Sequence, residues 1–183
     1  CLQVFGGHGY IRESGMEQFV RDSRINMIYE GTNTIQALDL LGRKVLGDSG
    51  AKLKKFGKIV AQFVEDEGTD EAMQEFVNPL ADLGDKVTKL TTEIGMKALQ
   101  NADEVGAAAV DYLRVCGHLV FAYFWARMAK VALGKAESDD AFYKAKLATA
   151  RFYFAKLLPE TAGLIRTARS GVKPMMEMDE ALF

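Results

Sequence analysis

Residues 28–34 read Ile-Tyr-Glu-Gly-Thr-Asn-Thr, and we expect the chain to be organised around this stretch. One carboxylate, Glu30, lies between an apolar flank and a glycine, and a helix is expected to open at Thr32. An apolar flank beside a helix N-terminus can partly desolvate a carboxylate and direct it into a cleft. Burial disfavours the charged form, so such a carboxylate can accept and hold a proton near neutral pH. Glu30 is therefore the candidate catalytic residue.

The residues after Glu30 are consistent with a ligand site and also with a simpler structure. Gly31 leaves room for a ligand to approach, and Thr32 and Thr34 place hydroxyls beside the free N–H groups of a helix start, where phosphate often binds. In the simpler interpretation Thr32 is only an N-cap and Glu30 is solvated. Spacing alone favours that interpretation, because the capping preference of threonine explains the pattern.

Helical spacing is evident on both sides of this stretch. Apolar residues upstream predict a helix that leads to Glu30, namely Met16, Phe19, Val20, Ile25 and Ile28. Downstream, a helix over residues 32–46 is predicted with one apolar face, formed by Ile35, Leu38, Leu41, Val45 and Leu46. Gly47 is a natural stop, and residues 48–50 read as a short connector. These signals predict a first part over residues 1–47.

Residues 51–183 predict further helices and form the second expected part. Amphipathic patterns cover residues 52–67 and 80–99, and Asn101 with Glu104 has the layout of a capping box for a helix that ends near Leu133. Ser138, Asp139 and Asp140 should open a last long helix, which Pro159 should kink or divide. Strand-like alternation is not convincing anywhere, so the predicted fold class is all-α, a helical bundle.

The run from Val115 to Ala126 carries no formal charge. It is about twelve residues long where a membrane span needs about twenty, and Arg114 and Arg127 bracket it. A buried bundle helix, rather than a transmembrane segment, is therefore expected. Within it, His118 is expected to be a hydrogen-bonded structural residue, since no second ligand stands at metal-binding spacing.

Composition narrows the classes of function. The 183 residues carry a net charge of −2 with mixed signs, which gives no electrostatic footprint for nucleic acid. Cys1 and Cys116 are too few for a disulfide framework, and they lack metal-ligand spacing. We therefore expect no bound metal, and we expect the protein to be in the cytoplasm. The chain begins at Cys1 without a basic or apolar leader, and we expect it to be a fragment of a longer protein.

Three motifs in the first 46 residues or so carry a family resemblance. They are Gln3-Val4-Phe5-Gly6-Gly7-His8-Gly9-Tyr10, Arg21-Asp22-Ser23-Arg24, and Ile28-Tyr29-Glu30-Gly31-Thr32 followed by Ile35-Gln36. In this order they resemble the end of the C-terminal helical domain of acyl-CoA dehydrogenases. The resemblance implies an FAD-dependent oxidation of acyl-CoA to trans-2-enoyl-CoA, by α-proton abstraction and hydride transfer to the flavin.

The resemblance also implies roles for individual residues. Glu30 matches the catalytic base, and Gly31 matches a residue that lines the acyl-CoA site. The stretch lying against the FAD diphosphate is matched by Thr32, Asn33 and Thr34. The loop that touches the FAD of a neighbouring subunit is matched by Gln3, Gly6 and Gly7. The implied partners are an electron-transfer flavoprotein and further copies of the chain in a homo-oligomer.

Residues 51–183 are similar to the helical extension of larger, mostly bacterial, members of the family. The expected fragment should be inactive alone, because it lacks the flavin-domain sheet and the earlier helices. Two alternatives remain open. The full-length protein would be an acyl-CoA oxidase if it passed electrons to oxygen, or the chain would be a non-catalytic bundle for oligomerisation or partner binding.

Overall fold

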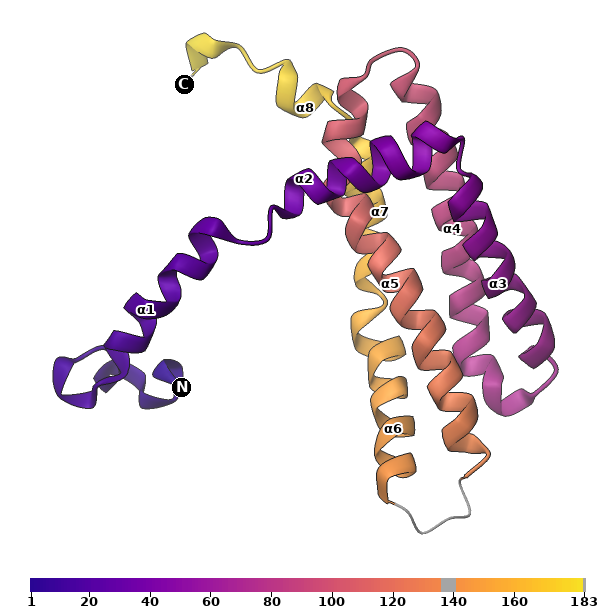
Figure 1. Cartoon of the computed structure of the whole chain (residues 1–183), viewed down its shortest axis with the longest axis horizontal. Coiled ribbons are helices and arrows are strands. Elements are labelled where there is room, and N and C mark those ends of the chain that lie inside the picture. Colours follow the sequence, from indigo (N-terminus) through magenta and orange to yellow (C-terminus); the bar gives the residue numbers. More distant parts are fainter. Residues whose placement is uncertain (136–140, 183) are drawn as a thin grey trace. The chain divides into compact units, whose positions relative to one another are not determined.

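The computed structural model describes residues 1–135 and 141–182, and the regular structure within these ranges is helical throughout (Figure 1). This confirms the all-α prediction. Contacts divide the chain into two compact units, Cys1–Gln36 and Ala37–Phe183. The residues predicted to open the last long helix, Ser138 to Asp140, lie outside the described residues.

The first unit contains two 3₁₀ segments, Leu2–His8 and Arg12–Ser14, followed by helix α1, Met16–Tyr29. The α1 helix confirms the predicted helix that leads to Glu30. Helix α2, Asn33–Leu38, begins in this unit and continues as a π-helical segment, Asp39–Val45, in the second. Among residues 1–36 only Gly9 and Glu17 are buried, so the first unit has no hydrophobic core of its own.

The second unit is a bundle of long helices packed side by side (Figure 1). Helices α3, Ala51–Glu67, and α4, Gln74–Ala98, are followed by the longest helix, α5, Asp103–Leu133. The last long layer consists of α6, Ala141–Phe152, a π-helical turn, Tyr153–Leu157, and α7, Glu160–Ser170. A short helix, α8, Lys173–Met176, follows. Helix α5 packs against α4, α6 and α7.

Local signals explain where the bundle helices begin. Gly50 precedes α3 with a φ of 75°, a left-handed conformation that glycine adopts without a Cβ clash. The Asp70 carboxylate accepts a hydrogen bond from Ala72 N at 2.9 Å, ahead of α4. Asn101 Oδ1 accepts from Asp103 N at 3.0 Å ahead of α5, whereas Glu104 N donates to the Asn101 backbone carbonyl at 3.2 Å, so the Asn101 side-chain bond to Glu104 N of the predicted capping box is replaced by these two contacts.

The core lies between α4 and α5 and extends to the π-helical segment before α3. The predicted apolar face of α4 is buried, whereas Leu99 at its end is 89% exposed. The largest fully buried side chains are Tyr112, Phe76, Leu41, Met73, Leu80 and Leu90. Exposed ion pairs join the helices at the surface. Arg151 of α6 binds Glu75 of α4 at 2.8 Å, and Arg169 of α7 binds Glu93 of α4 at 2.6 Å.

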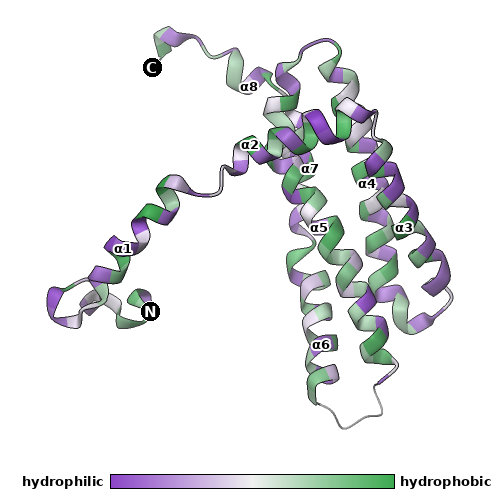
Figure 2. Cartoon of the chain, viewed as in Figure 1, coloured by the Kyte–Doolittle hydropathy of each residue, from purple (hydrophilic) through white to green (hydrophobic). Residues whose placement is uncertain are grey.

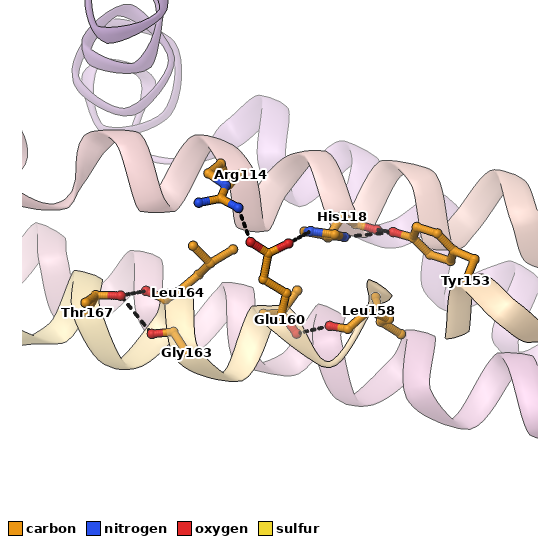
Figure 3. Close-up of polar contacts among 9 residues, drawn as sticks. Arg114, His118, Tyr153, Leu158, Glu160, Gly163, Leu164 and Thr167 are labelled. Carbon is orange, nitrogen blue, oxygen red and sulfur yellow. Dashed lines mark hydrogen bonds and ion pairs between the residues drawn. The ribbon is translucent and has the colours of Figure 1, made fainter. Parts of the chain in front are cut away.

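Pro159 divides the last long helix, as predicted, and a polar cluster lies at the break (Figure 3). Glu160, the first residue of α7, pairs with Arg114 and lies 3.3 Å from His118 Nε2. His118 Nδ1 lies 3.0 Å from the Tyr153 hydroxyl. These contacts confirm His118 as a hydrogen-bonded structural residue between α5 and the last layer.

The expectation that residues 115–126 form a buried helix is only half right. Val115, Leu119 and Ala122 are buried, but Phe121 is 58% exposed and Phe124 is 49% exposed. The reason is that α5 packs against other helices along one side, while its opposite side is also apolar. Helix α5 is long and apolar enough to cross a membrane, and 33% of its most apolar stretch is buried, where it packs against α4, α6 and α7.

Candidate functional site

The Glu30 turn joins α1 to α2 and has an unusual backbone. Glu30 ends α1 with φ of 30° and ψ of −140°, and Thr32 has a φ of 55°. Left-handed conformations cost a non-glycine residue of order 1–3 kcal/mol. Such strain persists where the surrounding contacts define the backbone strongly, and it is concentrated at functional sites. Gly31 lies between these two residues, so the whole turn departs from ordinary helix-to-helix geometry.

The Glu30 carboxylate lies across the start of α2. Its Oε1 accepts a hydrogen bond from Asn33 N at 2.7 Å. The N–H groups of a first helical turn have no partner within the helix, so this contact satisfies one of them. The carboxylate thus has a defined orientation although Glu30 is exposed. The apolar flank formed by Ile28 and Tyr29 is exposed as well, at 68% and 65%, so the partial desolvation expected for Glu30 is not provided by this chain.

Thr32 stands at the N-cap position, but its side chain does not cap the helix. Its carbonyl accepts from Gln36 N at 3.0 Å, whereas its hydroxyl donates to the Gly31 carbonyl at 2.6 Å. The simpler interpretation, in which the Thr32 hydroxyl caps α2, is therefore wrong, because Thr32 has a left-handed φ of 55° and its hydroxyl is turned to the Gly31 carbonyl. Gln36 Nε2 also donates to the Gly31 carbonyl, at 2.7 Å. Sequence reasoning gave Gln36 no role beyond its place in the family motif, because this contact to a carbonyl is not the capping-box pattern.

The other predicted cofactor contacts lie elsewhere in the first unit. Gln3, Gly6 and Gly7 belong to the 3₁₀ segment at the N-terminal end of α1, whereas Glu30 follows the C-terminal end of α1 (Figure 1). Fourteen residues of α-helix span about 21 Å. Gly6 has a φ of 56° and open space around it, so this loop bends at an exposed glycine. The structure therefore brings Glu30 to Thr34 together and places Gln3, Gly6 and Gly7 apart from them.

A groove of about 750 Å³ lies between α3 and α4 in the second unit. It has the volume of a small-molecule site, but none of the predicted site residues lines it. Its lining combines small residues, including Gly57, Ala61 and Gly84, with charged residues such as Lys58 and Asp85. Within residues 1–135 and 141–182, no group of three or more His, Cys, Asp or Glu side chains is arranged to hold a metal ion. Glu30 and its turn are therefore the strongest candidate site.

Comparison with protein families accounts for both parts of the chain. Residues 1–46 match the acyl-CoA dehydrogenase C-terminal domain. Residues 56–179 match the family described as acetyl-CoA dehydrogenase C-terminal like. The Glu30 turn lies in the first of these segments, and the α3–α7 bundle, except for the first residues of α3, lies in the second.

Individual relatives extend over both segments. A broad-specificity linear acyl-CoA dehydrogenase of Mycobacterium tuberculosis is 32% identical over the whole chain, which covers 32% of that protein. A 3-methylmercaptopropionyl-CoA dehydrogenase of Ruegeria pomeroyi is 36% identical over 87% of the chain and 28% of its own length. A butyryl-CoA dehydrogenase of Syntrophomonas wolfei is 33% identical over 89% of the chain and 28% of its own length. The chain spans about a third of the length of these relatives, and it belongs to the acyl-CoA dehydrogenase family.

Proposed function

We propose that the full-length protein oxidises an acyl-CoA thioester to the trans-2-enoyl-CoA, with Glu30 as the general base. The observation that carries this proposal is the strained turn at Glu30, Gly31 and Thr32, which orients a carboxylate within the segment that matches the acyl-CoA dehydrogenase C-terminal domain. The acyl-CoA dehydrogenases named above are consistent with this reaction class.

The geometry of Glu30 suits the removal of a proton. Oε1 is held by Asn33 N, and no hydrogen bond to Oε2 is present within the described ranges. Oε2 is therefore the oxygen available to take the proton from the carbon next to the thioester carbonyl. That proton is weakly acidic, so catalysis needs a carboxylate whose pKa is raised by burial. In the full-length protein, walls supplied by other segments would exclude water from Glu30, and Gly31 would line the acyl-CoA site.

The residues after Glu30 fit an FAD diphosphate. Thr34 brings a hydroxyl to the first turn of α2, and this turn also presents backbone N–H groups, of which Asn33 N is used by Glu30; the Thr32 hydroxyl, which donates to the Gly31 carbonyl, would have to turn to donate to a phosphate oxygen. Such donors suit phosphate oxygens. When bound, FAD would supply the hydride acceptor, and the protein would supply its position. Gln3, Gly6 and Gly7 would contact the FAD of a neighbouring subunit, since they lie at the other end of α1 from Glu30.

The remaining assignments follow from the same proposal. We assign residues 1–47 to the end of the catalytic helical domain and 51–183 to the helical extension. The protein would work as a homo-oligomer in the cytoplasm of a bacterium and pass electrons to an electron-transfer flavoprotein. The chain by itself would be inactive, because Glu30 and its neighbours are exposed in it.

The test is anaerobic mixing of the full-length protein with acyl-CoAs of increasing chain length while the visible absorbance of the flavin is followed. Glu30→Gln keeps an oxygen that can accept from Asn33 N but removes the base, whereas Glu30→Ala removes both. If the base assignment is right, Glu30→Gln still binds acyl-CoA but bleaches at least about a hundredfold more slowly. Gln36→Met is the matched control, because it disturbs the Gly31 carbonyl contact without touching the carboxylate.

Two results would count against the proposal. Equal bleaching by the wild type and Glu30→Gln would place the base elsewhere and leave Glu30 as the cap of α2. No bleaching with any acyl-CoA, in a protein that retains its flavin, would remove the dehydrogenase assignment itself. Peroxide formed in air at the rate of substrate oxidation would identify an acyl-CoA oxidase instead.

A further inference from the structure

The α3–α4 groove has a mostly apolar lining that includes two lysines. Glycines of both helices line it, and at Gly57 and Gly84 the space where a side chain would stand is open. Protein interiors are close-packed, so an open apolar groove of this volume between helices is a place where another group binds. Lys54 and Lys58 are the two lysines. The groove therefore suits an occupant with an apolar face flanked by carboxylates.

The two lysines lie toward the end of the groove where α3 begins and α4 ends. Leu46, just before α3, has its Cδ2 atom 3.3 Å from the point where a Cβ of Gly95 would stand, so the start of α3 lies beside the end of α4. The acidic lining residues, Glu65 and Asp85, come later in α3 and earlier in α4, and so belong to the other half of the groove. The half beside the end of α4 is therefore basic.

Lys54 and Lys58 are available to an acidic partner. The Lys54 ammonium reaches only the Ser49 carbonyl, at 3.4 Å, and neither lysine makes an ion pair with another residue of 1–135 or 141–182. Lys52 is different, because it pairs with Asp48 at 3.3 Å. Unpaired charges beside an apolar lining favour a partner of opposite charge and disfavour one of the same charge. The basic half of the groove thus selects for carboxylates.

The C-terminal tail, residues 173–182, has an apolar face that nothing covers in the described part of the chain. Its four large apolar side chains are 53–77% exposed, namely Met175, Met176, Met178 and Leu182. Three of them, Met175, Met178 and Leu182, recur at intervals of three and four, which places them on one face of a helix. Methionine side chains adapt to irregular apolar surfaces. This face therefore suits a groove lined by small residues.

The same tail is acidic. It carries Glu177, Asp179 and Glu180 against a single cation, Lys173, and Figure 2 shows hydrophilic and hydrophobic residues mixed along it. Glu177 and Glu180 fall opposite the face with Met178 when the tail is wound as one helix. Helix α8 and the 3₁₀ turn Glu180–Leu182 already provide two short helical pieces. The tail thus has the chemistry that the basic half of the groove requires.

The tail leaves the bundle beside the basic half of the groove. Lys97 of α4 donates to the Arg169 carbonyl at 2.8 Å, close to the start of the tail, and lies two residues after Gly95, which lines the groove. Leu99 follows Gly95 by four residues, so it lies on the same side of α4, and it is 89% exposed. Met96 beside it is 66% exposed. An apolar path therefore leads from the end of α7 to the groove.

The tail is long enough to take this path. About three extended residues span roughly 10 Å, close to the diameter of a helix with its side chains. Residues 175–182 then form about 12 Å of helix. The stretch of α4 that lines the basic half, residues 88–95, is about 11 Å long. The first residues of the tail can therefore cross α4 while the rest lies along the groove.

We propose that the α3–α4 groove is a docking surface for an acidic, methionine-rich segment, and that the chain's own tail, residues 173–182, is this segment. In the docked state Met175, Met178 and Leu182 cover the small residues of the groove, and the carboxylates of the tail pair with its two lysines. The structure has the tail in an open position, with its backbone hydrogen bonds made among residues 172–182. The tail is thus a strap that closes over the groove, whatever the role of Glu30.

Disulfide trapping in the full-length protein tests the docking. With Cys1 replaced by serine, Thr92→Cys in the groove and Met178→Cys in the tail should form a disulfide within one chain. The matched control combines Met178→Cys with Lys89→Cys, since Lys89 is an exposed residue of α4 that does not line the groove. The groove pair should cross-link at least about tenfold faster than the control pair, because docking raises the local concentration of the two thiols. Equal rates, or disulfides only between two chains, would overturn the proposal.

Charge reversal tests the pairing with the lysines. Lys54→Glu together with Lys58→Glu should slow the groove cross-link about fivefold or more, because like charges then meet. Lys55→Glu is the control, since Lys55 is exposed on α3 outside the groove, and it should change the rate less than about twofold. Adding Glu177→Lys and Glu180→Lys to the reversed lysines should restore the rate. An equal effect of the control, or a failed rescue, would refute the pairing.

Maleimide labelling of Thr92→Cys distinguishes the tail from another occupant. In the full-length protein the docked tail should protect this thiol, and a variant that ends at Val172 should be labelled at least about fivefold faster. Slow labelling both with and without the tail would mean that another segment covers the groove. Fast labelling in both would mean that the groove is open. Either result would overturn the proposal.

Discussion

The hydrogen bond between Tyr112 and Thr91 joins the two helices with the most extensive packing in the bundle, α4 and α5. Tyr112 is fully buried, and its hydroxyl lies 2.7 Å from Thr91 Oγ1. Thr91 Oγ1 also donates to the Val87 carbonyl at 2.7 Å. A threonine hydroxyl has a single proton, so Tyr112 must be the donor to Thr91. Burial raises the pKa of Tyr112 well above its ordinary value, so the phenol stays protonated across the physiological range.

Because Tyr112 donates and Thr91 accepts, removing one hydroxyl should not cost the same stability as removing the other. Tyr112→Phe removes the donor and leaves Thr91, which is half-buried and still bonded to Val87, so it should cost about 1 kcal/mol. Thr91→Val keeps the shape but strands a buried phenol O–H, which costs about 1–3 kcal/mol. The Cys116 thiol beside Tyr112 is a weak acceptor that can partly replace Thr91. We therefore expect Thr91→Val to lower the free energy of unfolding by about 2 kcal/mol. In the double variant no O–H is stranded, so it should be no less stable than Thr91→Val alone.

Urea unfolding followed by far-UV circular dichroism measures these free energies for the wild type, both single variants and the double variant. The expected coupling between the two positions is about 1 kcal/mol. The reasoning is refuted if Tyr112→Phe costs more than Thr91→Val, or if the two costs simply add. Thr88→Val is a suitable control, because Thr88 is an exposed threonine on α4 that donates only to the Gly84 carbonyl.

Two further predictions concern the bundle core. Burial raises the pKa of Cys116 from 9.0 to about 11. Near pH 8 the thiolate form of Cys116 is therefore about 100-fold rarer than that of a solvated thiol. Iodoacetamide should label the exposed Cys1 before Cys116. In the folded state the Cys116 thiol keeps its proton up to about pH 11, whereas in the unfolded chain it loses that proton above about pH 9. The thermal stability should therefore fall between about pH 9 and pH 11, and Cys116→Ala should make this fall smaller. Phe76→Ala should lower the free energy of unfolding in urea by about 3–5 kcal/mol, because Phe76 is fully buried and packs edge-on against Phe154, with ring centroids 5.3 Å apart. An equal loss for Phe152→Ala, at an exposed position, would contradict this reasoning.

Helix positions and most of the core were predictable from local pattern. The apolar series Leu80, Leu83, Val87, Leu90 and Ile94 is buried along one side of α4, as its spacing indicates. Pro159 ends one helix and precedes another because its ring has no N–H and blocks the preceding turn. These features depend on neighbours within a turn or two, so one sequence contains the information.

The candidate site was predictable in position but not in detail. The sequence located Glu30 between two helices, and the structure has α1 end at Tyr29 and α2 begin at Asn33. The left-handed backbone of Glu30 and Thr32, and the capping of α2 by the Glu30 carboxylate, were not predictable. Threonine has a strong capping preference, but the left-handed backbone of Thr32 goes with a hydroxyl that is turned to the Gly31 carbonyl, and the Glu30 carboxylate, three residues before Asn33, accepts from Asn33 N.

By itself the sequence determined that the chain is all-α, where its helices lie and which residue is the candidate base, since helical periodicity, caps and glycine or proline stops are local properties. Only the tertiary structure decided which side of α5 is buried. That helix is apolar around most of its circumference, so its periodicity does not distinguish the side with Tyr112 and Leu119 from the side with Phe121 and Phe124. The physical reason is that burial depends on which surface the other helices cover, and the packing of α4, α6 and α7 leaves the side with Phe121 and Phe124 exposed.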